Sequence, residues 1–340
     1  MIQKEIESII AGNHLTEEEM IECMSKIMSG EVTDTQIASF LTALKSKGEA
    51  ISEIVGGAKV LREKADVVEL QNYYTVDTCG TGGDKLGTFN ISTAVAIIIA
   101  AADIPVVKHG NRSVSSKCGS ADVLEALGIK IDLLPTQVEK CVREINIGFF
   151  FAPTFHKAMR FVGKTRKELG FRTIFNILGP LANPANAKAQ VLGVFDEALT
   201  EPMAEVLKNL GVERALVVHG YDGLDEISTT SETKITELKE GVIKTYTVMP
   251  EDFGFERAKI EDIKGGSAKE NAQIIKDLFN GQRGFKREIL VLNAAAALYV
   301  GKRVDNIKDG ITFVQELIDS GKVKTKLEEF IRYTNSFHTS

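Results

Sequence analysis

The chain has 340 residues, of which 44% are hydrophobic, 26% are charged and 7% are aromatic, and its formal net charge is −6 at pH 7. This composition is typical of a globular protein and excludes a disordered, collagen-like or disulfide-scaffold chain. The negative net charge argues against a protein that wraps nucleic acid through a general positive field.

The length predicts two domains or one large one. No apolar run reaches the roughly 20 residues that a membrane span requires, and the acidic N-terminus does not resemble a secretory signal. The four cysteines form no C-x-x-C pair, so the sequence indicates neither a zinc site nor a redox motif, and the thiols are expected to be reduced and mostly buried. We therefore expect a cytoplasmic protein that binds neither membrane nor nucleic acid.

The N-terminal region has the periodicity of short amphipathic helices. Residues 16–19 form a capping box ahead of an apolar stripe. Thr33 or Asp34 is expected to cap the next helix, and Ser52 a third one. The pattern predicts a small helical domain over residues 1–70.

After this region the pattern changes to short apolar or β-branched runs that alternate with helical stretches, which indicates βα units and a mainly parallel sheet. The candidate strands cover residues 74–77, 106–108, 129–131, 147–151, 190–195, 215–219 and 289–292. The candidate helices between them cover residues 90–102, 120–127, 135–144 and 199–210. We predict an α/β fold with a small N-terminal helical domain and a larger domain, residues 71–340, around a central, mainly parallel sheet.

Two further stretches extend this prediction. Residues 156–182 are helix-like twice over and end in a Gly-Pro-Leu-Ala-Asn-Pro run, so helices within about residues 160–185 are expected to return to the helical domain and complete it. Residues 228–250 alternate polar and apolar side chains around Gly241, which predicts a hairpin.

The first chemical motif is a glycine-rich loop between a predicted strand and a predicted helix, within residues 77–93. Glycines let successive backbone N–H groups approach an anion, and the helix N-terminus adds its unpaired N–H groups. The loop matches neither a Walker loop nor G-x-G-x-x-G, because Lys85 stands where the third glycine is needed. It therefore predicts a phosphate cradle of another kind. The alternative is a tight structural turn in which Asn90 and Thr93 are plain helix caps.

The second motif, residues 108–120, also lies between a predicted strand and a predicted helix. Its three cations, several hydroxyls and two glycines provide point-charge, bidentate and hydroxyl donors, which suit a doubly phosphorylated ligand. In an open α/β sheet both loops lie beyond the carboxyl ends of their strands, where ligands usually bind. A solvated basic loop is the alternative.

Two weaker motifs follow. Asp225 and Glu226 end an acidic loop at residues 221–226, where their carboxylates can converge and hold Mg²⁺; an acidic turn without a ligand is the commoner case. Residues 160–167 form a cationic helical stretch in which Arg166 could offer its guanidinium to a carboxylate, and a solvated helix face is the alternative.

Together these motifs resemble the signatures of the anthranilate phosphoribosyltransferases over nearly the whole chain. The resemblance rests on residues 80–84, 90–93, 108–112 and 225–226, and the Lys-His-Gly-Asn-Arg run is its most specific part. It implies transfer of the phosphoribosyl group from 5-phospho-α-D-ribose 1-diphosphate to the amine of anthranilate, in L-tryptophan biosynthesis. It also implies a homodimer joined through the helical domains.

The resemblance also implies the site residues. Phosphoribosyl diphosphate would be bound by Gly80, Gly83, Asp84, Thr88, Asn90, Ile91, Ser92, Thr93, Lys108, His109, Gly110, Asn111, Arg112, Ser113, Val114, Ser115, Ser116 and Ser120. Anthranilate would meet Gly80, Asn111 and Arg166, with His109, His156 and Pro180 lining its approach. Two Mg²⁺ ions per subunit would be held by Ser92, Asp225 and Glu226.

The chemistry of this transfer asks for positioning and charge stabilisation. Positive charge develops on the ribose carbon and negative charge on the departing diphosphate, so fixed donors and Mg²⁺ around the diphosphate stabilise the transition state. The aromatic amine is already neutral at pH 7, so positioning matters more than deprotonation. We expect neither a covalent protein nucleophile nor an indispensable general base.

Three alternatives are weighed against this interpretation. A pyrimidine-nucleoside phosphorylase would typically be longer, with an additional C-terminal domain and without the Asn111-Arg112 pair, whereas residues 293–334 look only helical. A non-catalytic, nucleic-acid-binding paralogue would be expected to show a basic surface and damaged loop motifs. A type I phosphoribosyltransferase would need two acids before its Thr-Gly-Gly, and here only Asp77 is present.

Overall fold

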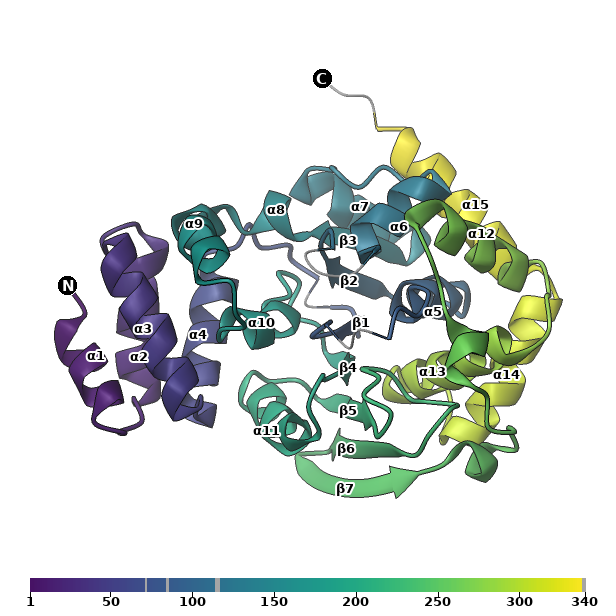
Figure 1. Ribbon diagram of the computed structural model, residues 1–340. Coiled ribbons are helices and arrows are strands. Elements are labelled where there is room, and N and C mark those ends of the chain that lie inside the picture. Colours follow the sequence, from purple (N-terminus) through teal and green to yellow (C-terminus); the bar gives the residue numbers. More distant parts are fainter. Residues whose placement is uncertain (71, 84–85, 114–116, 338–340) are drawn as a thin grey trace.

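The computed structural model describes residues 1–70, 72–83, 86–113 and 117–337. It places an N-terminal bundle of helices beside an α/β unit whose sheet is flanked by helices on both faces (Figure 1). The predicted fold class is confirmed.

Four helices form the N-terminal bundle: α1 (Gln3–Ile10), α2 (Glu17–Met28), α3 (Asp34–Lys47) and α4 (Ile51–Glu63). The predicted capping box begins α2, where the Thr16 hydroxyl accepts from the Glu19 N–H and the Glu19 carboxylate accepts from the Thr16 N–H. Thr33 caps α3 as expected.

The predicted cap at Ser52 is wrong. Ala50 is the N-cap residue of α4, and the buried Glu53 carboxylate accepts its N–H at 2.7 Å. Ser52 lies inside the first turn and donates its hydroxyl to the Leu15 carbonyl at 2.8 Å. A contact with another part of the bundle therefore decided the role of this serine.

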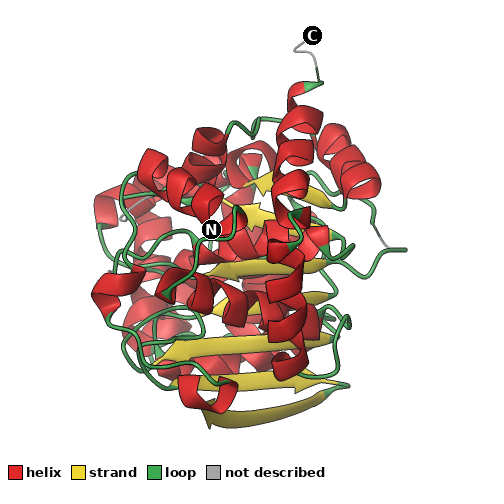
Figure 2. Cartoon of the chain, turned by 90° about the vertical axis from the view of Figure 1, so that its right-hand side faces the viewer, coloured by secondary structure: helices red, strands yellow, loops and turns green. Residues whose placement is uncertain are grey.

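Seven strands form one sheet in the order β3-β2-β1-β4-β5-β6-β7. They are β1 (Val76–Gly80), β2 (Val106–Gly110), β3 (Ile147–Phe151), β4 (Ala189–Gly193), β5 (Arg214–Gly220), β6 (Thr233–Lys239) and β7 (Val242–Val248). Strands β1 to β5 run parallel, while β6 and β7 form the predicted hairpin at one edge. Its turn residues Glu240 and Gly241 both have positive φ, which suits the twist of a tight hairpin. Figure 2 shows these strands lying one below another as a single sheet.

The remaining α-helices are α5 (Ile91–Ala101), α6 (Ser120–Leu127), α7 (Pro135–Ile145), α8 (Ala152–Phe155), α9 (Arg160–Leu169), α10 (Phe175–Leu178), α11 (Thr200–Asn209), α12 (Ala268–Phe279), α13 (Phe285–Val300), α14 (Ile307–Asp319) and α15 (Lys322–Asn335). Short 3₁₀ turns are η1 (Lys157–Met159), η2 (Gly179–Leu181), η3 (Glu197–Leu199), η4 (Pro250–Phe253) and η5 (Ile260–Ile263). The predicted helical character of residues 293–334 is confirmed by α13, α14 and α15.

Two predicted strands are wrong. Ile129 and Ile131 are buried, but the Ile129 N–H donates to the Leu124 carbonyl of α6 and the Lys130 N–H donates to the Thr334 hydroxyl of α15. These backbone groups therefore bond to helices instead of to a neighbouring strand. Residues 289–292 lie inside α13, which is buried almost all round. Such a helix has an uninterrupted apolar run, which periodicity alone does not distinguish from a buried strand.

Two hydrophobic clusters lie on opposite faces of the sheet. One lies between the sheet and helices that include α5, α13, α14 and α15; the other holds the N-terminal bundle and continues through α10 and α11. Neighbouring residues of β4 divide between them, because Val191 belongs to the first cluster and Leu192 to the second. Helix α9 packs on α2 and α3, and α10 packs on α4.

No disulfide joins the four cysteines, which all lie within the described ranges, and three of them are buried, as expected. Within the described ranges, no helix combines the length and the hydropathy needed to cross a membrane.

Candidate functional site

The predicted motifs meet where the parallel strands end. The glycine-rich loop follows β1, the basic loop follows β2, and the acidic loop follows β5. In the register of the sheet, Gly80 is paired with Gly193, the last residue of β4. Loops far apart in the sequence therefore lie together at the carboxyl ends of the strands. The glycine-rich, basic and acidic loops are together called the cradle.

Two glycines admit the acidic loop across the strand ends. A Cβ atom on Gly193 would lie 1.6 Å from the backbone oxygen of Asp225, and one on Gly80 would lie 2.4 Å from the Asp225 carboxylate. Gly82 and Gly83 have φ values of +68° and +81°, a conformation that favours glycine. Glycine is needed here both for space and for backbone conformation.

Backbone N–H groups orient the two carboxylates of the acidic loop. Asp225 Oδ2 accepts from the Gly82 N–H at 2.9 Å, and Glu226 Oε1 accepts from the Ser92 N–H in the first turn of α5 at 3.1 Å. Behind them, the buried Asn293 of α13 exchanges two hydrogen bonds of 2.9 Å with the backbone of Ile227. The carboxylates are thus held against the glycine-rich loop and the start of α5.

A buried cation lies beneath this arrangement. Lys108 Nζ donates to the Thr78 carbonyl at 2.5 Å and lies 3.5 Å from the Ser92 hydroxyl. Burial lowers the pKa of Lys108, while the neighbouring Asp77, Cys79 and Glu226 oppose that shift. Burial likewise raises the pKa of Asp77 to about 6, against the attraction of Lys108.

Asp77 also connects two strands through hydrogen bonds. Its carboxylate accepts from the His109 N–H at 3.2 Å and from Asn183 Nδ2 at 2.8 Å, and Asn183 also donates to the Val107 carbonyl. The sequence motifs did not single out Asn183. Its signal was the Asn-Pro pair after the Gly-Pro-Leu-Ala run, which was interpreted only as a chain return.

The basic loop is tied to α6. Arg112 forms ion pairs with Asp122 at 3.1 Å and Glu125 at 2.5 Å, and these hydrogen-bonded carboxylates raise the pKa of its guanidinium. The Ser120 hydroxyl donates to the Asn111 carbonyl at 3.2 Å. The Arg112 guanidinium therefore pairs with α6, while Lys108 is the cation placed beside Ser92. The predicted ligands Asp84, Val114, Ser115 and Ser116 lie outside the described residues.

The suggestion that Asn90 and Thr93 are plain helix caps is wrong. Asn90 occupies the N-cap position of α5 without a side-chain cap bond, and Thr93 lies buried within the helix. Asn90 Nδ2 donates to the Cys118 carbonyl at 3.2 Å, and its Oδ1 accepts from Asn271 of α12 at 3.0 Å. It therefore links both loops to α12, and Asn271 is a support that sequence reasoning missed.

Three further predicted ligands lie around this position. The side chain of Ile91 is buried in the core. Thr88 forms an isolated bridge with Lys264, and the neighbouring Gly265 N–H donates to Gly87 at 2.9 Å. The Ser113 N–H donates to the Asp122 carboxylate at 3.0 Å.

A cleft of about 560 Å³ opens beside the cradle. Its walls come from the ends of β1 and β2, from α8, η1, α9 and α10, and from η2. Every residue that the resemblance implied for anthranilate or its approach lines this cleft: Gly80, His109, Asn111, His156, Arg166 and Pro180. Gly80 belongs to both parts of the site, since it also abuts Asp225.

Three cations, Lys157, Arg160 and Arg166, and two neutral imidazoles line the cleft. Arg166 is half-buried with its guanidinium 5.1 Å from the centroid of the Phe175 ring, and burial lowers its pKa. Among the described residues no carboxylate lies within 4.0 Å of Arg166. The rings of His109 and His156 lie 5.1 Å apart, and burial lowers the pKa of His109 to about 3 and that of His156 to about 4. The cleft therefore suits a flat ligand with an anionic group.

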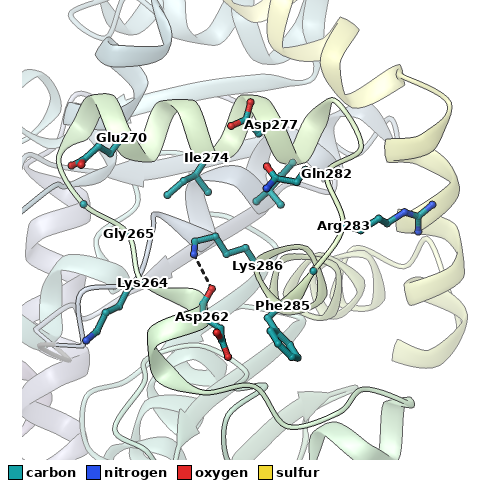
Figure 3. A pocket seen from close by; sticks show the side chains of 13 residues that line it. Asp262, Lys264, Gly265, Glu270, Ile274, Asp277, Gln282, Arg283, Phe285 and Lys286 are labelled. Carbon is teal, nitrogen blue, oxygen red and sulfur yellow. Dashed lines mark hydrogen bonds between the residues drawn. The ribbon is translucent and has the colours of Figure 1, made fainter.

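A second cavity, of about 430 Å³, lies between α12 and the start of α13 (Figure 3). Lys286 points into it and donates to the Asp262 carbonyl at 2.8 Å, while Arg283 is turned away towards Asp319. It contains none of the residues predicted for the site. The strand-end cleft is therefore the better candidate for catalysis.

The donors at the strand ends fit Mg²⁺ held together with a phosphorylated ligand. Two carboxylates, Asp225 and Glu226, lie against the glycine-rich loop and the backbone of Ser92. Across the described ranges, no group of three or more His, Cys, Asp or Glu side chains could hold a metal ion by itself. Mg²⁺ usually combines one or two protein carboxylates with water and substrate phosphates, so this set is sufficient.

Comparisons with known proteins agree with this geometry. Residues 72–324 match the model of the glycosyl transferase family, a/b domain, and residues 3–65 match that of the glycosyl transferase family, helical bundle domain. The chain is 58% identical to an anthranilate phosphoribosyltransferase of Acetivibrio thermocellus, covering 99% of this chain and 98% of that one. It is 53% identical to the enzyme of the same name from Methanobrevibacter smithii, covering 99% and 100%.

Solved structures are similar over the same length. An anthranilate phosphoribosyltransferase from Thermus thermophilus superimposes with a TM-score of 0.92 at 41% identity, covering 97% of this chain and 99% of that one. The Saccharomyces cerevisiae enzyme in complex with PRPP and Mg superimposes with a TM-score of 0.89 at 28% identity, covering 99% and 98%. Its complex with 4-fluoroanthranilate gives a TM-score of 0.89 at 27% identity, with the same coverage.

Proposed function

The chain belongs to the anthranilate phosphoribosyltransferases of the glycosyl transferase family, and from this premise we propose how its two-part site divides the reaction. It is a Mg²⁺-dependent enzyme that transfers the phosphoribosyl group of 5-phospho-α-D-ribose 1-diphosphate to the amine of anthranilate, producing N-(5-phosphoribosyl)anthranilate and diphosphate in tryptophan biosynthesis. We assign phosphoribosyl diphosphate to the cradle and anthranilate to the cleft. The observation that carries this division is that the two parts meet at Gly80.

On the donor side, the chain supplies fixed dipoles and oxygen ligands. Asp225, Glu226 and the hydroxyl of Ser92 are the groups that would hold two Mg²⁺ ions, which neutralise the charge that develops on the departing diphosphate. Lys108 Nζ donates to the Ser92 hydroxyl oxygen at 3.5 Å, so one lone pair of that oxygen faces the ammonium group and the second is left for a metal ion. The glycines provide backbone N–H groups at close range to the phosphate oxygens.

On the acceptor side, the chain orients a neutral amine. Arg166, supported by the ring of Phe175, would pair with the carboxylate of anthranilate. His109 and His156 are held neutral by burial, so they add polarity to the wall of the cleft without repelling the developing positive charge on ribose. Holding the amine opposite the ribose carbon replaces the need for a general base.

We also propose a homodimer in the cytoplasm, joined through the N-terminal bundle. The homodimer is proposed from the family resemblance, and four cysteines without a disulfide support a reducing compartment. The contacts of α9 and α10 with the bundle support a helical domain of residues 1–70 that these mid-chain helices complete.

The function is tested by following anthranilate fluorescence in purified protein mixed with phosphoribosyl diphosphate and Mg²⁺. We expect fluorescence to fall only when both substrates and the metal are present, and EDTA to abolish the fall. If folded protein produces no fall, the assignment is wrong, and phosphorolysis of thymidine or uridine would then identify a pyrimidine-nucleoside phosphorylase instead.

A further inference from the structure

Arg172, in the link between α9 and α10, reaches the glycine-rich loop of the cradle. Its Nη2 atom donates to the Gly83 carbonyl at 2.6 Å. Its guanidinium carbon lies 4.0 Å from the centroid of the Phe195 ring, at the end of β4. The residue belongs to none of the motifs that the sequence showed, yet it touches two of the loops that surround the diphosphate site.

Gly83 and Phe195 together fix the position of this guanidinium. A Cβ atom on Gly83 would lie 2.2 Å from Arg172 Nη2, so a side chain at this position would force the end of the arginine side chain to move. The Phe195 N–H donates to the Thr81 hydroxyl at 3.0 Å, and the Thr81 N–H donates to Gly193 at 2.9 Å. The ring under the guanidinium is therefore tied to the same loop that the guanidinium holds. A planar guanidinium suits this combination, since it stacks on a ring while donating in its own plane.

The loop is consequently held from two sides. Asp225 accepts the N–H of Gly82, and Arg172 donates to the carbonyl of Gly83. Both glycines have positive φ and would otherwise have wide conformational freedom. Ordering the loop before the substrate arrives removes an entropic cost from binding.

The same link supports the cleft. Arg166 precedes it on α9 and Phe175 follows it at the start of α10, and both line the cleft. Within the link, the Thr173 N–H donates to Asn176 Oδ1 at 3.0 Å, which makes the start of α10 compact. The residue that contacts the glycine-rich loop therefore lies in the short link between two segments of the cleft wall.

We propose that Arg172 is a positioning residue that fixes the glycine-rich loop for phosphoribosyl diphosphate. The inference rests on the proposed division of the site into cradle and cleft. Arg172 acts through Gly83 and Phe195 and is not itself a ligand of the substrate.

The test compares Arg172→Gln, Arg172→Lys and the control Arg303→Gln. Arg303 also stacks on a ring, with its guanidinium 5.5 Å from the centroid of Phe313, but it lies outside both parts of the site, so the control matches the change in charge and in stacking. Arg172→Gln is expected to raise KM for phosphoribosyl diphosphate on the order of tenfold, with a smaller loss of kcat and little change in KM for anthranilate at saturating donor. Arg172→Lys should recover part of the loss, because an ammonium group donates to Gly83 but does not stack as a plane.

A second measurement makes the result independent of turnover. Titration calorimetry with phosphoribosyl diphosphate and Mg²⁺ should show the same order of affinities as KM, with the control equal to the parent protein. Phe195→Leu should weaken binding less than Arg172→Gln, and adding it to Arg172→Gln should cost little more, since both variants break one contact.

The outcomes are distinct. The proposal is overturned if Arg172→Gln binds the donor within twofold of the parent protein. It is also overturned if KM for both substrates rises equally with a lower unfolding temperature and the lysine variant recovers nothing, because that pattern indicates a structural role only. Failure of the division of the site would show separately, as a parent protein that binds the donor but does not consume anthranilate.

Discussion

The cradle and the cleft differ in the kind of groups from which they are built. The cradle uses backbone N–H groups, glycines and two neighbouring carboxylates, all in loops that follow strands of the sheet. The cleft uses side chains from separate parts of the chain, from Leu61 in α4 to Ala182 after η2. An anion can be held by almost any correctly oriented backbone, whereas a flat aromatic acceptor needs a shaped wall.

The arginines of the two regions differ in the partners that surround them. Arg112 beside the cradle is paired with Asp122 and Glu125, so its charge is already balanced. Arg166 in the cleft lies over the ring of Phe175, and it forms no ion pair with a carboxylate among the described residues. In the proposed division of the site, the cleft would thus offer a positive charge to the carboxylate of anthranilate, while Mg²⁺ would offset the charge of the diphosphate in the cradle.

The largest effect is expected from Asp225→Asn with Glu226→Gln. The amide oxygens can still accept from Gly82 and Ser92, so the loop keeps its hydrogen bonds while Mg²⁺ loses its charged ligands. We expect kcat/KM to fall roughly a thousandfold, equivalent to several kcal/mol of transition-state stabilisation. The measurement is the rate as a function of Mg²⁺ concentration.

The control for this variant is Glu328→Gln with Glu329→Gln, two adjacent acids on α15. It removes the same formal charge at a distance from the strand ends and should leave the Mg²⁺ dependence unchanged. An unaltered Mg²⁺ dependence in the Asp225 and Glu226 variant would remove these residues from the metal site.

The next effect is expected from Gly193→Ala. Its methyl group would collide with the backbone oxygen of Asp225, which a side-chain rotation does not relieve. The acidic loop must shift, and a displacement of about 1 Å in a catalytic group costs on the order of a hundredfold in rate. Steady-state kinetics with circular dichroism as the folding control measures this. Activity within twofold of the parent protein would mean that the position of the loop is not critical.

Arg166→Ala tests the cleft alone. Loss of a charge-assisted hydrogen bond predicts an increase in KM for anthranilate of about 10- to 100-fold, with KM for phosphoribosyl diphosphate nearly unchanged. Lys167→Ala, at an exposed position of the same helix, is the matched control and should alter neither constant. An effect confined to phosphoribosyl diphosphate would place Arg166 in the cradle instead.

The smallest effect on turnover is expected from pH. Because burial lowers the pKa of His109 to about 3 and that of His156 to about 4, kcat/KM for anthranilate should show no histidine inflection between pH 6.5 and 8. Such an inflection, lost in His109→Gln or His156→Gln, would mean that an imidazole titrates during catalysis.

Stability should depend on these histidines more strongly than turnover does. Below pH 6.5 the unfolded chain takes up protons that the folded protein does not, so the free energy of unfolding falls as the pH decreases, by about 2 kcal/mol per histidine at pH 5. Asp77 has the opposite effect. Between about pH 6 and the ordinary pKa of an aspartate, the folded chain binds a proton that the unfolded chain does not, so the free energy of unfolding rises as the pH decreases. Unfolding curves of the parent protein and of His109→Gln with His156→Gln at pH 7 and pH 5 isolate the histidine contribution. An identical loss in both would contradict it.

Local patterns predicted much of the fold. The capping box at Thr16 and the hairpin at Gly241 depend on residues within a few positions of each other, and both are confirmed. The errors at residues 129–131 and 289–292 arose where a buried apolar run lacks periodicity, so that only its neighbours determine whether it forms a strand, a helix or an irregular segment.

The candidate site likewise has parts that local sequence predicted and parts that it did not. By itself the sequence determined the loops of the cradle, because glycines, hydroxyls and carboxylates directly after strands have few other uses together. The tertiary structure decided which groups support them: Asn183 on Asp77, Asn271 on Asn90, Asn293 on the acidic loop and Arg172 on Gly83. Each of these contacts joins residues at least 66 positions apart in the chain. The half-buried Arg172 became identifiable only through its contact with Gly83. The three asparagines became identifiable only when folding buried them, because a buried polar group must find its partner wherever the packing of the sheet and helices places one.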